Sequence, residues 1–219
     1  KSIKLRNLAV GKKIVATNDN NSKKEIKITQ GKSQKEFNID NLRSNIVTIR
    51  IGQGHGSGFF VGNNGYLLTN AHVVGDSKSV QIITSSGMEI EGQVIRKSKS
   101  RDVSLIKVPL KITNSLNLKF EIPDIASDVY AAGTPIDEAL KTTVTKGIIS
   151  NIRVDNASGL KFIQADASIS PGNSGGPLFD KFGNVIGISV AKYNANSAEG
   201  LGLFIPLQDA FSSIKLSIE

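Results

Sequence analysis

A single serine stands between glycines at residues 171–177, which read PGNSGGP. Gly172 and Gly175 bracket Ser174, and glycine permits the sharp turn that presents a hydroxyl at the tip of a loop. In such a turn the backbone N–H groups of Gly172 and Ser174 could converge on one oxygen atom as an oxyanion hole. This setting indicates a nucleophilic serine, provided that the chain also supplies a base and an acid.

Only two histidines, His55 and His72, are available as the general base. His55 lies in GQGHGSG, for which we expect a glycine-flanked loop that holds an imidazole poorly. His72 lies in LLTNAHVV, at the end of an expected apolar strand, where packing can fix the ring. A lone histidine is usually a structural residue, so His72 becomes the candidate base only in combination with the other motifs.

The candidate acid is Asp102 in SRDVSLIKV, directly before an expected apolar strand. An aspartate in this position can be buried and held by backbone donors, as the carboxylate that orients a catalytic histidine must be. The simpler alternative is a turn residue at the start of a strand.

Serine hydrolases of different folds differ in the order of their catalytic residues along the chain. Here the order is His72, Asp102, Ser174. The segment GNSGG also fits the G-x-S-x-G pattern, but in α/β-hydrolases the acid and the histidine follow the serine, and no histidine follows Ser174. The subtilisin order requires an aspartate before the histidine and a helix-rich α/β frame, which the strand pattern disfavours. Histidine, then aspartate, then serine is the order of the chymotrypsin-like double β-barrel.

The hydrophobic pattern from residue 45 onward is that of short strands separated by turns. Alternation predicts a strand at 45–52, and residues 57–70 predict a hairpin around the turn 62–65. We expect further strands at 79–84, 88–96, 103–108, 128–132, 143–153, 160–165, 184–191 and 201–205. Short strands at a spacing of about 8–12 residues are typical of an antiparallel sandwich or barrel. After Pro206, apolar residues recur at helical spacing as far as Ile218 and predict a C-terminal amphipathic helix.

The composition excludes several classes of chemistry. The chain has 219 residues, of which 39% are hydrophobic and 21% are charged, as in a folded globular protein. It has no cysteine, which excludes disulfides, thiolate catalysis and cysteine-ligated zinc. With two histidines and no H-E-x-x-H pattern, we expect no metal site and no cofactor. No apolar run approaches the ~18 residues needed to cross a bilayer.

The net charge of +8 is concentrated near the N-terminus. Residues 1–38 carry ten lysines and arginines against three acidic residues, a net charge of +7, whereas residues 39–219 carry only +1. We expect residues 1–38 to form a small basic β appendage, or the remnant of an upstream domain, and residues 39–219 to form the main domain. A lysine-rich arm is usually a solvated segment, and the alternative is contact with polyanions or a membrane surface. Because aromatic residues are sparse, we expect no specific nucleic-acid partner.

Residues 42–212 resemble a known family, the trypsin-like protease domain of the HtrA/Deg serine proteases. The resemblance rests on GSGFFVGNNGYLLTNAHVV (56–74), RDVSLIKV (101–108), the segment 129–153, DASISPGNSGGPLFDKFGNVIGI (166–188) and GLGLFIPL (200–207). It implies an all-β, chymotrypsin-like fold of two perpendicular six-stranded barrels with the site in the cleft between them. It also implies endopeptidase activity on unfolded or accessible polypeptide, as in protein quality control, with His72 as base, Asp102 as its orienting acid and Ser174 as nucleophile.

The resemblance further places the primary substrate pocket at Ile169 and Val190, with Ala191 and Lys192 near its mouth. An apolar wall at Ile169 favours small or medium aliphatic side chains before the cut. Lys192 is unusual at this position, and a lysine there can instead admit an acidic side chain.

Two positions depart from the pattern of relatives. Asn173 precedes the nucleophile where digestive relatives have an aspartate, so activation by a freshly cut N-terminus is not expected. Val190 stands where many relatives have threonine or serine, so a hydroxyl that would hold the acid is missing. This departure, together with the glycine-rich loop, motivates an alternative: a catalytically silent protease-fold scaffold or chaperone.

The resemblance also suggests partners and a compartment. Polypeptides are the expected substrates, trimers are common among relatives, and an extracytoplasmic location is favoured. Only seven residues follow Ser212, so we expect no PDZ domain in this chain.

Overall fold

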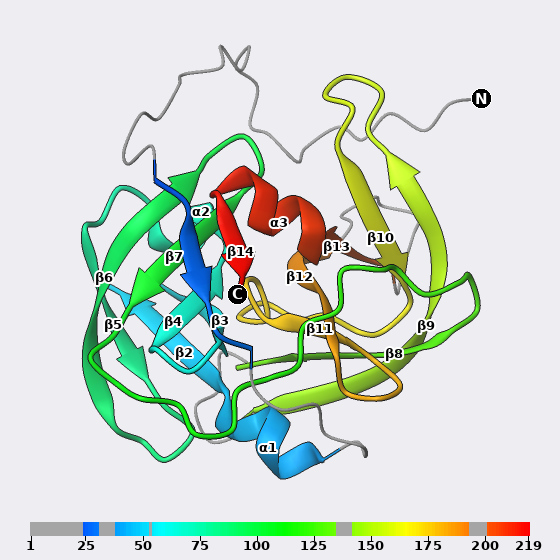
Figure 1. The fold of residues 1–219 in the computed structure, drawn as a ribbon. Coiled ribbons are helices and arrows are strands. Elements are labelled where there is room, and N and C mark those ends of the chain that lie inside the picture. The colour runs from blue at the N-terminus through cyan, green and yellow to red at the C-terminus, as the bar shows by residue number, and fades with distance from the viewer. Residues whose placement is uncertain (1–23, 31–37, 53, 135–141, 193–200) are drawn as a thin grey trace.

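The structure is a computed structural model that describes residues 24–30, 38–52, 54–134, 142–192 and 201–219. The side chains at positions 191 and 192 lie outside this described part. The dominant feature is a pair of closed, six-stranded antiparallel β-barrels (Figure 1), which confirms the predicted all-β, chymotrypsin-like fold.

The first barrel has the hydrogen-bonded strand order β2-β3-β4-β7-β6-β5. Its strands are β2 (Ile46–Ile51), β3 (Gly54–Val61), β4 (Tyr66–Thr69), β5 (Ser79–Ile83), β6 (Glu89–Ser98) and β7 (Val103–Lys107). The predicted hairpin joins β3 to β4. Gly62 and Gly65, at the two ends of its turn, have φ angles of 66° and 69°, which favour glycine. Alternating residues of β2, among them Val47 and Ile49, point into a core that Phe60 also fills.

The second barrel has the strand order β10-β13-β12-β11-β8-β9. Its strands are β8 (Asp128–Gly133), β9 (Thr143–Val154), β10 (Lys161–Ala165), β11 (Pro177–Asp180), β12 (Val185–Lys192) and β13 (Gly202–Pro206). Strand β11 was not predicted, because its four residues are all buried and show no alternation. A second core, which includes Ile149, Ile163 and Phe204, fills the interior.

A third cluster of buried apolar residues joins the two barrels. Phe59 and Leu68 of the first barrel, Phe179 and Ile205 of the second, and Phe211 of the last helix all belong to it. Each of these side chains is at most 2% exposed. Burial of this extent holds the two barrels in one arrangement, since each buried aromatic or aliphatic side chain contributes about 1.5–3 kcal/mol.

Three short helices complete the fold: α1 (Ile39–Ser44), α2 (Ala71–Val74) and α3 (Leu207–Ser213). Helix α1 was not predicted, although Asn38 is a good N-cap whose side chain accepts a hydrogen bond from the Asn41 N–H at 3.0 Å. The predicted C-terminal helix is present, but its expected extension to Ile218 is wrong. The chain leaves the helix after Ser213, and residues Leu216–Ile218 form strand β14.

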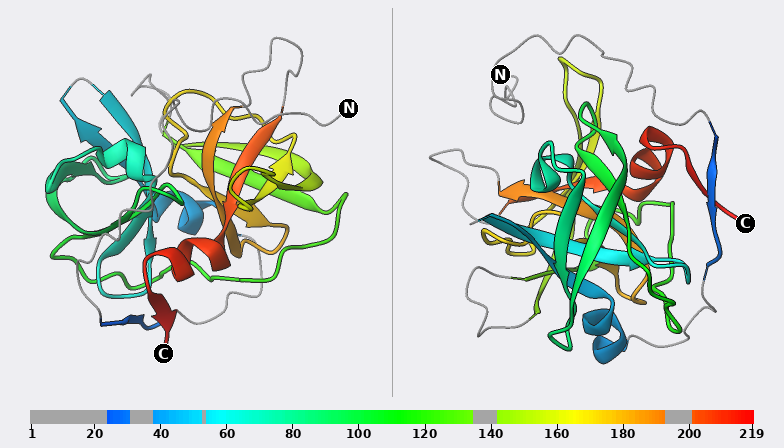
Figure 2. Two further views of the ribbon diagram at one scale, coloured as in Figure 1. Left: turned by 90° about the horizontal axis from the view of Figure 1, so that it is seen from above. Right: turned by 90° about the vertical axis from the view of Figure 1, so that its left-hand side faces the viewer.

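The segment before α1 lies against the end of the chain. Strand β1 (Ile26–Ile28) pairs in parallel with β14, and Figure 2 shows the two strands side by side in both views. Arg96 on β6 is buried, and its guanidinium donates to the carbonyls of Ile214 at 2.7 Å, Lys215 at 2.6 Å and Lys24. Much of the predicted β appendage, residues 1–23 and 31–37, lies outside the described residues, and the division after residue 38 stays a prediction.

Two further observations concern the described ranges. None of their helices combines the length and apolar character that a bilayer span requires. These ranges also contain no cluster of histidine and acidic residues suited to a metal ion.

Candidate active site

His72 lies in helix α2, directly after strand β4, and not at the strand end that the sequence suggested. The buried neighbours Ala71 and Val74 hold this short helix against the first barrel. The apolar run around the histidine resembles a strand, because four residues are too few to show helical periodicity. The ring itself stays accessible, with 51% of the His72 side chain exposed.

Asp102 contacts His72 at two points. Its Oδ1 accepts the backbone N–H of His72 at 2.9 Å, and its Oδ2 lies 2.7 Å from the ring Nδ1. A carboxylate at Nδ1 favours the tautomer with the proton on Nδ1, which leaves Nε2 free to accept a proton. The hydrogen bond that the His72 ring donates to Asp102 raises the pKa of His72, and partial burial of the ring opposes this effect.

The backbone around Asp102 is arranged for this contact. Asp102 has a φ angle of 62°, in the left-handed region that aspartate tolerates better than most residues. Strand β7 begins at the next residue, Val103, which is fully buried. The side chain of Asn70 donates to the Asp102 carbonyl at 3.1 Å and so ties the aspartate to the start of α2.

Ser174 lies in a turn of the second barrel that packs directly on the first. The N–H of Ser57 donates to the Ser174 carbonyl at 2.8 Å, and the Gly175 N–H donates to the Ser189 carbonyl at 2.9 Å. Gly175 has a φ angle of 86°, and a Cβ there would lie 2.2 Å from the Ser57 carbonyl oxygen and 2.3 Å from Thr69 Oγ1. Only glycine fits this close approach, which brings the serine loop against the strands that lead to α2.

The Ser174 hydroxyl donates to the Val190 carbonyl at 3.1 Å. Among the residues that the structure describes, it makes no hydrogen bond with His72. The structure therefore joins His72 to Asp102 and places the serine loop beside them, while the hydroxyl itself is turned toward β12.

Two backbone N–H groups of the Ser174 loop have no acceptor within the described part of the chain. The N–H of Asn173 donates to the Ser170 carbonyl at 3.0 Å, and that of Gly176 donates to the Asn173 carbonyl at 2.9 Å. No described residue accepts a hydrogen bond from the N–H of Gly172 or of Ser174. Gly172 has a φ angle of 97°, a conformation that a residue with a side chain rarely adopts.

The predicted pocket residues come from adjacent strands and the loop before the serine. Ile169 and Val190 are buried, and the backbone of Lys192 pairs with Gly202 across β12 and β13. A Cβ on Gly202 would lie 2.7 Å from Ile169 Cδ1, so Ile169 packs directly on this glycine. Sequence reasoning missed Gly202, although a glycine inside an apolar strand is a signal of close approach.

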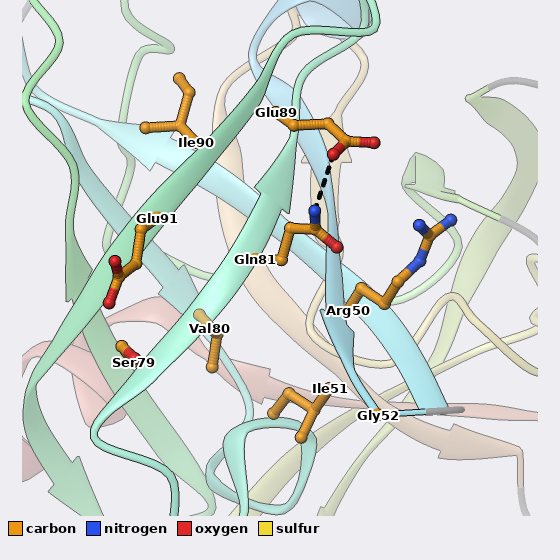
Figure 3. A pocket seen from close by; sticks show the side chains of 9 residues that line it. All are labelled: Arg50, Ile51, Gly52, Ser79, Val80, Gln81, Glu89, Ile90 and Glu91. Carbon is orange, nitrogen blue, oxygen red and sulfur yellow. Dashed lines mark hydrogen bonds between the residues drawn. The ribbon is translucent and has the colours of Figure 1, made fainter.

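A separate groove of about 540 Å³ lies on β2, β5 and β6 of the first barrel (Figure 3). Its lining mixes charged and aliphatic side chains with one amide, Gln81, which donates to Glu89 Oε2 at 2.7 Å. None of the predicted site residues lines this groove.

His55 lies within strand β3, where it pairs with Arg50, and not in the loop that the sequence suggested. The buried Nε2 of His55 has no hydrogen-bond partner within the described residues. Its contacts therefore give no support to His55 as an alternative base.

Two closed barrels, with a histidine–aspartate pair on the first and a glycine-bracketed serine on the second, are typical of the chymotrypsin-like class of proteins. The family model of the trypsin-like peptidase domain matches residues 56–188. The chain belongs to this family, and its relatives there are HtrA-type proteases.

Three curated and two solved relatives illustrate the similarity. A probable periplasmic serine endoprotease DegP-like of Pseudomonas fulva is 38% identical over 170 residues, which cover 74% of this chain and 34% of the relative. The putative serine protease HhoB of Synechocystis is 38% identical over 165 residues, 72% of this chain and 39% of the relative. The serine protease HtrA-like of Staphylococcus epidermidis is 30% identical over 210 residues, 84% of this chain and 35% of the relative.

Among solved structures, the HtrA-type protease AlgW with tripeptide has a TM-score of 0.70 and 29% identity, over 79% of this chain and 61% of that chain. The serine endoprotease from Yersinia pestis has a TM-score of 0.69 and 27% identity, over 82% of this chain and 66% of that chain. The chain spans about a third of the length of the curated relatives that it matches.

Proposed function

We propose that this chain is a serine endopeptidase domain that cleaves accessible or unfolded polypeptide through an acyl-enzyme. The observation that carries the proposal is the two-point contact between Asp102 and His72, at 2.9 Å and 2.7 Å, beside the Ser174 loop. A carboxylate that fixes both the backbone and the ring of a histidine orients it as a general base.

In the proposed reaction the Ser174 hydroxyl turns from the Val190 carbonyl toward His72 Nε2. His72 removes the hydroxyl proton as the serine oxygen attacks a peptide carbonyl, and Asp102 stabilises the imidazolium that forms. The N–H groups of Gly172 and Ser174 donate to the oxyanion of the tetrahedral intermediate. The imidazolium then protonates the leaving amine, and water, deprotonated by His72, attacks the ester and releases the acyl group.

We expect the pocket to accept small or medium aliphatic side chains on the residue before the scissile bond. Ile169, which packs on Gly202, supplies its apolar wall, whereas the Val190 side chain packs in the cluster that joins the two barrels. An acidic side chain is the alternative, which Lys192 would recognise at the mouth. A peptide-library cleavage profile distinguishes the two, because their optimal substrates differ in charge.

The test of the activity is cleavage of casein by the wild-type chain and by Ser174→Ala. The exposed turn residue Ser86, changed to alanine, serves as the matched control. We expect Ser174→Ala to lose cleavage and Ser86→Ala to retain it. Cleavage by a pure preparation of Ser174→Ala at the wild-type rate would contradict the proposal.

A second candidate is a catalytically silent scaffold or chaperone with this fold. The hydrogen bond of the Ser174 hydroxyl to the Val190 carbonyl favours it, because a hydroxyl held there is not activated. This candidate predicts suppression of aggregation of an unfolded protein without any covalent reaction of Ser174, even in the presence of added peptide.

Assembly, location and the basic arm are further parts of the proposal. We infer that the chain forms a homo-oligomer and acts outside the cytoplasm, the latter supported by relatives that are named periplasmic. The arm is proposed to contact polyanions or a membrane surface. Deletion of residues 1–23, which spares β1, tests the arm through heparin retention as a function of salt, and sedimentation of the full chain tests the assembly.

A further inference from the structure

Ser57 on strand β3 connects the first barrel to two separate segments of the second. Its side chain is fully buried. Its Oγ lies 2.6 Å from the Gly172 carbonyl oxygen, 2.8 Å from the Thr134 nitrogen and 3.1 Å from Thr134 Oγ1. Thr134 follows the end of β8, and Gly172 belongs to the loop before Ser174, so one hydroxyl joins both segments.

The direction of these hydrogen bonds follows from the atoms involved. A carbonyl oxygen can only accept, so the single hydroxyl proton of Ser57 is donated to Gly172. The Thr134 N–H can only donate, and it donates to Ser57 Oγ. The Thr134 hydroxyl must then also donate to Ser57. The result is a chain of donors that runs from Thr134 through Ser57 to the Gly172 carbonyl, and such chains strengthen each bond by polarisation.

The backbone of Ser57 is engaged as well. Its N–H donates to the Ser174 carbonyl at 2.8 Å, and its carbonyl accepts the Thr69 hydroxyl at 2.7 Å. Every polar group of Ser57 therefore has a partner. One residue of the first barrel holds the carbonyl of Gly172 and the carbonyl of Ser174, the two residues whose N–H groups are the proposed oxyanion donors.

The orientation of the Gly172 carbonyl depends on its hydrogen bond with Ser57. Gly172 has no side chain and a φ angle of 97°, so its own conformational preference does not fix the peptide bond to Asn173. That peptide is held at its two ends, by Ser57 at the carbonyl and by the Ser170 carbonyl, which accepts the Asn173 N–H at 3.0 Å. Without the Ser57 bond, this planar peptide is held by the Asn173 N–H alone and can tilt as a unit.

We propose that Ser57 is a positioning residue for the oxyanion site, whose hydroxyl fixes the Gly172 carbonyl and thereby aims the N–H groups of Gly172 and Ser174 at the substrate oxygen. The inference rests on the proposed endopeptidase function. Ser57 acts through Gly172 and not on the substrate. Donors that are fixed before the reaction need no reorganisation when the oxyanion forms, and this is the origin of their effect on the rate.

The kinetic test compares Ser57→Ala, Thr134→Val and Ser104→Ala. Ser104 is the matched control, because it is a fully buried serine of the same barrel whose hydroxyl has no hydrogen-bond partner among the described residues. We expect kcat of Ser57→Ala to fall about 10- to 100-fold with KM within about twofold, somewhat less than the loss of a direct oxyanion donor. Thr134→Val should show a smaller decrease, and Ser104→Ala should retain the wild-type kcat.

A peptide aldehyde separates positioning from general stability. The adduct of the aldehyde with Ser174 places an oxygen atom in the oxyanion site. The inhibition constant of the aldehyde should therefore rise in Ser57→Ala in proportion to the loss of kcat. If Ser57 only stabilised the fold, Ser57→Ala would lower the melting temperature and leave kcat per folded molecule and the inhibition constant unchanged. That pattern would overturn the proposal.

Hydrogen–deuterium exchange gives a measurement that does not depend on activity. We expect the backbone amides of residues 170–176 to exchange faster in Ser57→Ala than in the wild-type chain, and at the wild-type rate in Ser104→Ala. If the wild-type chain cleaves nothing, the proposed function fails, while faster exchange would still support the role of Ser57 in holding the loop. Equal exchange in wild type and Ser57→Ala would overturn that role whatever the activity.

Discussion

Asp102 is held in place by the histidine that it orients. Its Oδ1 accepts the His72 backbone N–H at 2.9 Å, and its Oδ2 contacts the ring at 2.7 Å. The sequence suggested a weakly held acid, because Val190 provides no hydroxyl. The backbone of helix α2 supplies a donor instead, so the orientation of the carboxylate depends on the start of this helix.

The change Asp102→Asn tests the role of the carboxylate while conserving its shape. An asparagine amide would donate to Nδ1 and favour the wrong tautomer of His72, so we expect kcat to fall by about 10⁴-fold, as for other enzymes with this triad. Steady-state kinetics on a peptide substrate measure the loss. Asp155→Asn, a change of a half-buried residue in the connection between β9 and β10, is the control, and an equal loss in both variants would refute a specific role.

The pH dependence of activity should reflect the pKa of His72. Only the neutral imidazole accepts the serine proton, and the hydrogen bond that His72 donates to Asp102 raises the pKa of His72 above the ordinary value of 6.5. We therefore expect kcat/KM to rise with pH, with a midpoint above 6.5, and this midpoint to fall in Asp102→Asn. The same shift stabilises the fold at pH below 6.5, and this contribution is lost as pH rises through the raised pKa. A wild-type midpoint below 6.5 would contradict the assigned contact.

Arg101, next to the acid, ties the first barrel to the second. It is 4% exposed, its guanidinium donates to Asp209 at 3.1 Å and to the Lys161 carbonyl, and it lies 4.7 Å from the centre of the Phe162 ring. We expect Arg101→Met to lower kcat/KM by about tenfold, because small displacements of catalytic groups are costly. The melting temperature should also fall, since removal of one partner from a buried ion pair is destabilising, so kcat is compared per folded molecule.

The control for this variant is Arg153→Met, which removes a hydrogen bond of 2.6 Å to Gln164 within the second barrel. It should leave kcat/KM close to the wild-type value. A fall in melting temperature for Arg101→Met without any loss of kcat per folded molecule would show that Arg101 only stabilises the fold.

Ile169 should determine the size of side chain accepted before the cut. Ile169→Ala removes the side chain that packs on Gly202, so we expect kcat/KM for leucine or phenylalanine to rise about tenfold relative to valine. Gly202→Ala should act in the opposite direction, because its Cβ would lie 2.7 Å from Ile169 Cδ1. Cleavage profiles of the two variants on one peptide library measure both effects. Identical profiles would remove Ile169 from the pocket.

The sequence predicted the barrels well because strand alternation and turn glycines are local signals. Each strand expected from residue 45 onward overlaps a strand of the structure. The errors occur where distant contacts decide the conformation. Strand β14 exists because it pairs with β1, far away in the chain, and Lys215 with a φ angle of 52° ends the helical path that the apolar spacing suggested.

In the candidate site, too, local signals could be recognised in the sequence and distant contacts could not. His72, Asp102 and Ser174 could be chosen from their motifs and their order, because the residue types alone restrict the chemistry. The contact between Ser57 and Gly172 could not be inferred, since it joins residues that are 115 positions apart in the two barrels. The direction of the Ser174 hydroxyl is also a property of the folded chain, because it depends on the position of the Val190 carbonyl.

Activation of Ser174 as a nucleophile can be measured by reaction with a fluorophosphonate followed by mass spectrometry of peptides. We expect one adduct, on Ser174, in the wild-type chain, and no adduct in His72→Ala. An unmodified wild-type chain in the presence of peptide substrate, or an adduct on another residue, would contradict the activation of Ser174.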